Sequence, residues 1–105
     1  MSNTEDRERV LIVDDEAGVR IFLQDLLSRS GYNTTAVHDG PSALNLLERT
    51  PFDLVLADIS MTPMDGIELT RRIKETDPQV AVVLMTGYPS IENAIAAMKY
   101  GADDY

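Results

Sequence analysis

The stretch RVLIVDDEAG, at positions 9–18, decides the fold. An aliphatic run at 10–13 leads directly into Asp14, Asp15 and a glutamate. A short, uninterrupted apolar run of this kind is typical of a strand that is buried on both faces of a sheet. Carboxylates resist burial, so the acids mark the point where this strand ends and the chain reaches water.

Short β-rich runs and helical periods alternate along the rest of the chain. The expected strands cover 9–14, 32–38, 52–58 and 79–86. The expected helices cover 16–30, 40–50, 67–76 and 90–101, and a further strand begins within 102–105. This alternation, with short connections, predicts an α/β fold with a doubly wound parallel sheet and helices on both of its faces. Ligands of such sheets bind beyond the carboxyl ends of the strands, where the winding reverses.

The composition is that of an ordinary globular domain. Apolar residues make up 44% and charged residues 26% of the 105 residues, which suits a single domain with one modest core. The formal net charge of −9 opposes direct binding to nucleic acid. No apolar run is long enough for a membrane span and the amino terminus lacks a secretory signal, so we expect a cytoplasmic protein without membrane contact. The absence of cysteine excludes disulfides and thiolate metal sites.

Acidic and hydroxyl side chains follow three of the expected strands. Asp14 and Asp15 end the first, Asp58 ends the third, and Thr86 with Gly87 ends the fourth. The carboxyl ends of parallel strands share one edge, so we expect these residues to be neighbours. Neighbouring carboxylates repel one another unless a cation lies between them. An all-oxygen ligand set suits Mg²⁺, with Mn²⁺ as a substitute.

The acids also indicate a phosphoryl substrate, because protein-bound Mg²⁺ usually has one or two carboxylate ligands together with a phosphate. One carboxylate could be the nucleophile and form an aspartyl phosphate, since aspartate is ionised at neutral pH and needs no general base. The only histidine, His38, ends a different strand. Thr86 could donate its hydroxyl to a phosphoryl oxygen, and Gly87 leaves room for close approach.

Each of these residues also has an ordinary structural interpretation. Asp15 could be only the N-cap of the following helix, and Asp58 could belong to a turn. Thr86 could be a strand-end residue with a β-branched side chain. Asp65 is interpreted as a turn and helix start, and residues 103–104 as an exposed turn. The coincidence of the acids and the threonine on one sheet edge favours the functional interpretation.

Four segments of the chain resemble the receiver domain of two-component response regulators. The segments are VLIVDDE, DLVLADISMTPMDG, VVLMTG and GADDY, in the family's order and spacing. The resemblance implies a chemotaxis-receiver-like, flavodoxin-like sheet in strand order 2-1-3-4-5, with the receiver domain over 9–105 and a flexible tail at 1–8. It also implies that most of strand five and all of helix five lie beyond Tyr105, so that the domain is incomplete at its carboxyl end.

The resemblance implies a role for each matching residue. Asp58 corresponds to the phosphoacceptor. The family's metal ligands are carboxylates and one backbone carbonyl, which correspond to Asp14, Asp15, Asp58 and the carbonyl of Ser60. Thr86 and Tyr105 correspond to the switch residues that change position on phosphorylation.

Two departures from the family's pattern affect the site. The family usually has a proline where this chain has Thr62, and here the proline is Pro63. The family's catalytic lysine, which pairs with the phosphoryl group, lies beyond Tyr105 and has no counterpart in this chain. Without that lysine the acids keep more unpaired negative charge.

The resemblance implies a phosphoacceptor signalling domain that receives its phosphoryl group from a sensor histidine kinase in a Mg²⁺-dependent reaction. The domain would control an output domain, such as a transcriptional activator, and is not expected to be an independent enzyme. An open sheet edge predicts homo-oligomers. One alternative is a pseudo-receiver that docks or dimerises without phosphorylation. The other is a haloacid-dehalogenase-like phosphatase, which needs two aspartates separated by one residue, whereas Asp14 and Asp15 are adjacent.

Overall fold

The computed structural model describes residues 7–87, 95 and 98–104. Its strands are Arg9–Val13 (β1), Asn33–Val37 (β2), Leu54–Asp58 (β3) and Ala81–Met85 (β4). Its helices are Ala17–Arg29 (α1), Gly40–Arg49 (α2) and Gly66–Thr76 (α3). The observed strands are slightly shorter than the expected ones. The helix expected at 90–101 lies largely outside the described residues. Within that range, the described residues 95, 98 and 99 are helical. None of the helices within the described ranges is long and apolar enough to cross a membrane.

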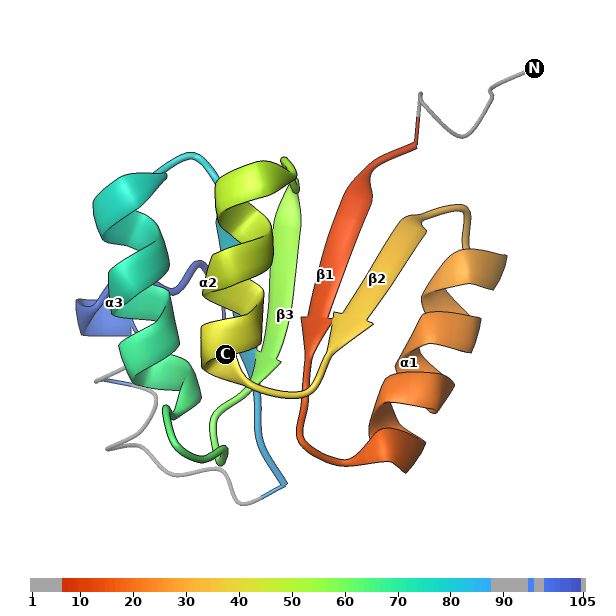
Figure 1. Cartoon of the computed structure of the whole chain (residues 1–105), viewed down its shortest axis with the longest axis horizontal. Helices are drawn as coiled ribbons and strands as arrows, with labels where there is room; N and C mark the ends of the chain where they lie inside the picture. Colours follow the sequence, from red (N-terminus) through yellow and green to blue (C-terminus); the bar gives the residue numbers. More distant parts are fainter. Residues whose placement is uncertain (1–6, 88–94, 96–97, 105) are drawn as a thin grey trace.

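The strands form one parallel sheet in the order β2-β1-β3-β4, which confirms the predicted order for these four strands. β1 pairs with β2 on one side and β3 on the other, and β3 also pairs with β4. Strands β1, β2 and β3 point in the same direction, so their carboxyl ends lie at one edge of the sheet (Figure 1). Asp104 forms a single parallel bridge with Val83 of β4, on the side where a fifth strand is expected.

The buried core joins residues of β1, β3 and β4 to residues of α2 and α3. The most completely buried strand is β1, which has a neighbouring strand on each side. Its residues 10–13 are at most 1% exposed, as the uninterrupted apolar run predicts. Helix α1 contacts β1 and β2, α2 contacts β1, α3 contacts β4, and α2 and α3 contact each other. From β1 the chain moves to β2 at one edge of the sheet, and from β2 it crosses β1 and continues in the opposite direction through β3 to β4. Right-handed connections therefore place α1 on the sheet face opposite α2 and α3, and α1 lies apart from those two helices (Figure 1).

Helix α1 is less buried than its apolar spacing predicts. Ile21 is 69% exposed, Phe22 65% and Leu26 48%, and no residue of the helix is fully buried. Within the described ranges, no element covers this stripe. The apolar periodicity therefore identified the helix correctly but does not show which of its residues are buried.

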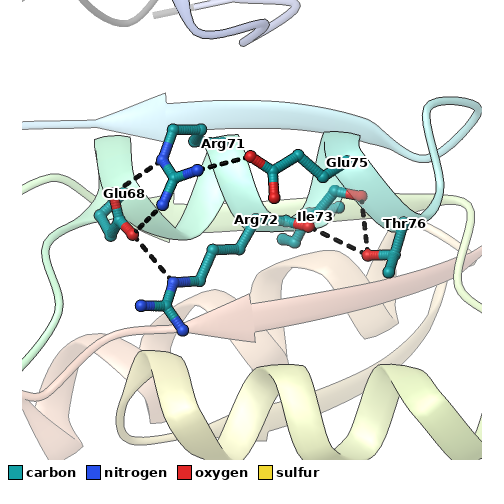
Figure 2. Close-up of polar contacts among 6 residues, drawn as sticks. All are labelled: Glu68, Arg71, Arg72, Ile73, Glu75 and Thr76. Atoms are coloured by element: carbon teal, nitrogen blue, oxygen red, sulfur yellow. Dashed lines mark hydrogen bonds and ion pairs between the residues drawn. The ribbon is translucent and has the colours of Figure 1, made fainter.

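Helix α3 is clearly two-faced. Its buried residues are Gly66, Leu69, Thr70 and Ile73. On its exposed side, Glu68 accepts hydrogen bonds from Arg71 and Arg72, and Arg71 also pairs with Glu75 (Figure 2). The hydrogen bonds from Arg71, and then those from Arg72, lower the pKa of Glu68 to about 2. These pairs lie three and four residues apart, the spacing at which side chains on one helix face meet.

Candidate functional site

The ends of β1 and β3 bring three acids together. Asp14, Asp15 and Asp58 each offer a carboxylate oxygen, and these oxygens all lie within 4.8 Å of one another. The two strands are adjacent, with Val13 paired to Ala57, so Asp14, which follows β1, lies beside Asp58, the last residue of β3. We call Asp14, Asp15 and Asp58 the acid cluster.

Asp14 is the buried member of the acid cluster, at 3% exposure. Its Oδ1 accepts a hydrogen bond of 2.9 Å from the backbone N–H of Glu16. Burial raises the pKa of the Asp14 carboxyl; the Glu16 hydrogen bond opposes this, and the charges of Asp58 and Asp15 raise it further. A cation at the acid cluster would reverse the effect of these negative neighbours.

Asp15 is exposed and lies beside its two acidic neighbours. The alternative that Asp15 is the N-cap of the following helix is wrong. The N-cap of α1 is Glu16, and its side chain makes no capping hydrogen bond. By contrast, Asp65 is the N-cap of α3 and accepts a 2.8 Å hydrogen bond from the N–H of Glu68, as the turn interpretation predicts.

Asp58 is the last residue of β3 and is partly buried. Its Oδ1 accepts a 3.1 Å hydrogen bond from the N–H of the exposed Ser60. The first residue of α3, Gly66, packs directly against this strand end. A Cβ at Gly66 would lie 2.5 Å from the backbone oxygen of Asp58 and 3.0 Å from Cα of Ile59. The interpretation of Asp65 as a turn and helix start does not predict this close approach at the next residue, which only a glycine permits.

Thr86 and Gly87 follow β4 at the same edge. Met85 pairs with Asp58 in the register of β3 and β4, so Thr86 comes directly after the partner of Asp58. Thr86 is partly buried, and Gly87 is exposed. A Cβ at Gly87 would meet no atom within 4 Å, so there is open space around this glycine. Tyr105, the other expected switch residue, lies outside the described residues.

The two lysines of the chain make contacts elsewhere. Nζ of Lys74 donates to Oδ2 of Asp103 at 2.8 Å, and Nζ of Lys99 lies 5.8 Å from the centre of the Tyr100 ring. Asp103 also accepts a 2.8 Å bond from the N–H of Val82. The Lys74 hydrogen bond, followed by that from Val82, lowers the pKa of Asp103. Asp103 is exposed and lies in a bend, as the interpretation of an exposed turn predicts, but it also joins α3 to β4, which the sequence did not predict.

Sequence analysis also missed Arg20. Its Nη1 donates a 2.8 Å hydrogen bond to the backbone oxygen of Asp14. A signal for this contact was available in the sequence. Helical side chains lean toward the amino end of their helix, so an arginine early in a helix that begins just after the acids can reach back to them.

A groove of about 550 Å³ lies between α2 and α3. Its lining includes Leu44, Leu47, Arg71 and Val80. None of the three acids belongs to this lining, so the groove and the acid cluster are separate features.

The acid cluster has the ligand chemistry of a magnesium site. Its donors are all carboxylate oxygens, which hard cations such as Mg²⁺ prefer and zinc does not. Three negative groups within 4.8 Å of one another give a cation a strong local attraction. The buried Asp14 adds to this, because its charged form lacks compensation from water.

Known proteins share both the sequence and the fold. The transcriptional regulatory protein ZraR of Escherichia coli K12 is 42% identical over 102 residues, which is 97% of this chain and 23% of ZraR. Sporulation initiation phosphotransferase F of Bacillus subtilis is 37% identical over 95 residues, 90% of this chain and 77% of that protein. The chain thus spans about a quarter of the length of the ZraR relatives and about three quarters of the Bacillus protein.

A solved structure of similar shape is the CheY-like response regulator receiver domain protein from Methanospirillum hungatei. Its TM-score is 0.90 at 31% identity, over 95% of this chain and 80% of that one. The family model for the response regulator receiver domain matches residues 10–105. Nearly the whole chain is matched, and the four-stranded order agrees with the flavodoxin-like sheet. The chain therefore belongs to the response regulator receiver domain family.

Proposed function

We propose that the chain accepts a phosphoryl group on Asp58 from the phosphohistidine of a sensor histidine kinase, in a Mg²⁺-dependent reaction. The observation that carries the proposal is the meeting of three carboxylates, within 4.8 Å, at the carboxyl edge of the sheet. Asp14 and Asp15 follow β1, and Asp58 ends β3. In this proposal all three bind the metal, and Asp58 is also the acceptor.

The metal would be held by the carboxylates of Asp14, Asp15 and Asp58 together with the backbone carbonyl of Ser60. When bound, Mg²⁺ offsets the negative charge of the phosphoryl oxygens. Ser60 already approaches Asp58 through its N–H, at 3.1 Å. Asp14 is fixed by burial and by Glu16, while Asp15 is exposed and therefore accessible to an incoming ligand.

In the transfer step, a carboxylate oxygen of Asp58 forms the new bond to phosphorus. The phosphorus–nitrogen bond of the donor breaks, and its electron pair stays on the leaving imidazole nitrogen. No general base is needed, because the attacking carboxylate is already ionised. Thr86 then donates its hydroxyl to a phosphoryl oxygen, and the space beside Gly87 admits the group.

Phosphorylation adds charge at the end of β3, and the Thr86 hydroxyl moves toward it. Tyr105 is the second switch residue of this proposal. The domain extends over 9–105, acts in the cytoplasm and has no independent turnover. Its partners are the kinase, an output domain such as a transcriptional activator, and a second copy of the chain. The names of two relatives, a transcriptional regulator and a phosphotransferase, support this role.

Incubation with acetyl phosphate and Mg²⁺, followed by intact-mass measurement, tests the proposal. We expect one added phosphoryl group in the wild type and in the control Asp25→Asn, which removes an exposed acid from α1. Asp58→Asn should gain none, and a chelator should prevent the addition in every variant. An adduct that persists in Asp58→Asn would assign the acceptor to another residue.

The same experiment separates the alternatives. A folded wild-type chain that never gains the phosphoryl group would favour a pseudo-receiver, which docks without phosphorylation. Repeated hydrolysis of small phosphate esters would favour a haloacid-dehalogenase-like phosphatase. The adjacent positions of Asp14 and Asp15 disfavour that enzyme, because its chemistry uses two aspartates separated by one residue.

A further inference from the structure

Arg20 connects helix α1 to the end of β1. Its backbone N–H bonds to the carbonyl of Glu16 at 3.1 Å, so it lies one turn into the helix. Its side chain leans back over that turn, and Nη1 donates a 2.8 Å hydrogen bond to the backbone oxygen of Asp14. The side chain is only partly exposed, so it is held within the structure rather than extended into water.

Three contacts hold Asp14 in place. Its N–H bonds to the carbonyl of Val37 in β2 at 3.2 Å, and its Oδ1 accepts from the N–H of Glu16 at 2.9 Å. The third contact is the one from Arg20 to its carbonyl oxygen. The first two donors are backbone groups. Arg20 is therefore the contact that a substitution can remove while the main-chain bonds of the turn remain.

We infer that Arg20 is a positioning residue for the acid cluster: by holding the carbonyl of Asp14, it fixes the direction in which the Asp14 and Asp15 carboxylates leave β1. The identity of the bound cation rests on the proposed function, whereas the positioning itself does not. The carbonyl of Asp14 belongs to the peptide group that it shares with Asp15. Because the peptide group is planar, holding this carbonyl fixes ψ of Asp14 and φ of Asp15 together.

A purely electrostatic role for Arg20 predicts the opposite result. A positive charge near a cation site weakens metal binding, so its removal should strengthen binding. Loss of a group that orients metal ligands instead weakens binding, typically by about 10- to 100-fold. The sign of the change in Mg²⁺ affinity therefore separates positioning from charge.

The test uses the full chain labelled with ¹⁵N. Mg²⁺ is titrated into the wild type, Arg20→Met, Arg20→Lys and the control Arg29→Met, and amide shifts at 14–16 give the affinity. Arg29 lies at the far end of the same helix, so its removal changes the net charge equally. We expect Arg20→Met to bind Mg²⁺ about tenfold more weakly, Arg20→Lys to recover most of the affinity, and Arg29→Met to bind no more weakly than the wild type.

Hydrogen exchange in the metal-free chain supplies a second measurement. The Glu16 amide, which donates to Asp14, should exchange faster in Arg20→Met than in Arg29→Met. If Arg20→Met fails to fold, Arg20→Gln replaces it with the same expectations, because its shorter side chain does not reach the Asp14 carbonyl.

Two results would overturn the inference: affinity in Arg20→Met equal to or tighter than that of the wild type, or an Arg20→Lys variant as weak as Arg20→Met. A wild type that binds no Mg²⁺ and takes no phosphoryl group would instead refute the proposed function. In that case the Glu16 exchange rates alone decide on positioning, and equal rates in Arg20→Met and Arg29→Met would refute it.

Discussion

Replacement of Asp58 by asparagine is expected to stabilise the metal-free protein, because it removes one of three neighbouring negative charges. Asparagine is nearly the same size and keeps the side-chain oxygen that accepts the hydrogen bond from the Ser60 N–H. The substitution therefore changes the charge of the acid cluster and little else. A gain in stability from the loss of the Asp58 charge would show that repulsion within the acid cluster destabilises the fold.

The distance between the carboxylates sets the magnitude. For two unit charges 4.8 Å apart, Coulomb's law gives about 0.9 kcal/mol in water and about 3.5 kcal/mol at an effective dielectric constant of ~20. Asp15 is exposed and Asp58 is partly exposed, so the lower value applies to their pair. We expect a net gain of about 1–2 kcal/mol, which at a typical urea dependence of about 1 kcal/mol per M raises the unfolding midpoint by about 1–2 M.

Urea unfolding is measured by circular dichroism near neutral pH, once with EDTA and once with excess Mg²⁺. Glu48→Gln, on the exposed side of α2, removes an equal charge away from the acid cluster and corrects for the general effect of a net charge of −9. Mg²⁺ at ten times its dissociation constant should stabilise the wild type by about 1.4 kcal/mol and Asp58→Asn by less. The stability difference between the two proteins should therefore shrink or reverse when Mg²⁺ is added.

Two outcomes would refute this reasoning. Equal midpoints for Asp58→Asn and Glu48→Gln in EDTA would mean that repulsion within the acid cluster does not destabilise the fold. Equal stabilisation of the wild type and Asp58→Asn by Mg²⁺ would mean that Asp58 is not part of the metal site.

Three further predictions concern the packing around the sheet. Gly66→Ala should lower the free energy of unfolding by about 1–3 kcal/mol, since its Cβ would meet the Asp58 carbonyl. The control Gly18→Ala should not lower it, because a Cβ at Gly18 meets no atom within 4 Å. Equal urea midpoints for the two variants would contradict the close contact at Gly66. Lys74→Met should lower the free energy of unfolding by about 1–2 kcal/mol in the same assay, because Asp103 loses its charged partner and keeps only the hydrogen bond from the Val82 N–H. The pKa of Asp103 is lowered in the fold, so its contribution is complete above about pH 4 and disappears as the pH falls through the folded pKa. The stability difference between the wild type and Lys74→Met should therefore narrow in acid, and a difference that is constant with pH would exclude this ion pair as its source.

The sequence predicts the sheet well because strand burial depends on local composition. The uninterrupted apolar run before Asp14 predicts a strand that is buried on both faces of the sheet, and the interior place of β1 in the strand order follows from the resemblance to the family. The acids at strand ends then predict the functional edge, since all strands of a parallel sheet end together. The meeting of Asp14, Asp15 and Asp58 follows from these two facts.

Contacts made by long charged side chains are harder to predict from the sequence. Asp103 looks like an exposed turn residue, yet it receives hydrogen bonds from a helix and a strand that are distant in sequence. The burial of α1 is another case, because spacing identifies an apolar stripe but not the element that covers it. In both cases the deciding partner comes from a separate part of the chain.

The sheet order separates the acid cluster from the outer sides of the helices. The three acids end the interior strands β1 and β3, while the solvent-facing sides of α1, α2 and α3 lie outside the sheet. Residues on those outer sides can change during evolution while the acids keep their positions. A substitution on an outer helix side can therefore change the surface of the domain without moving the three carboxylates.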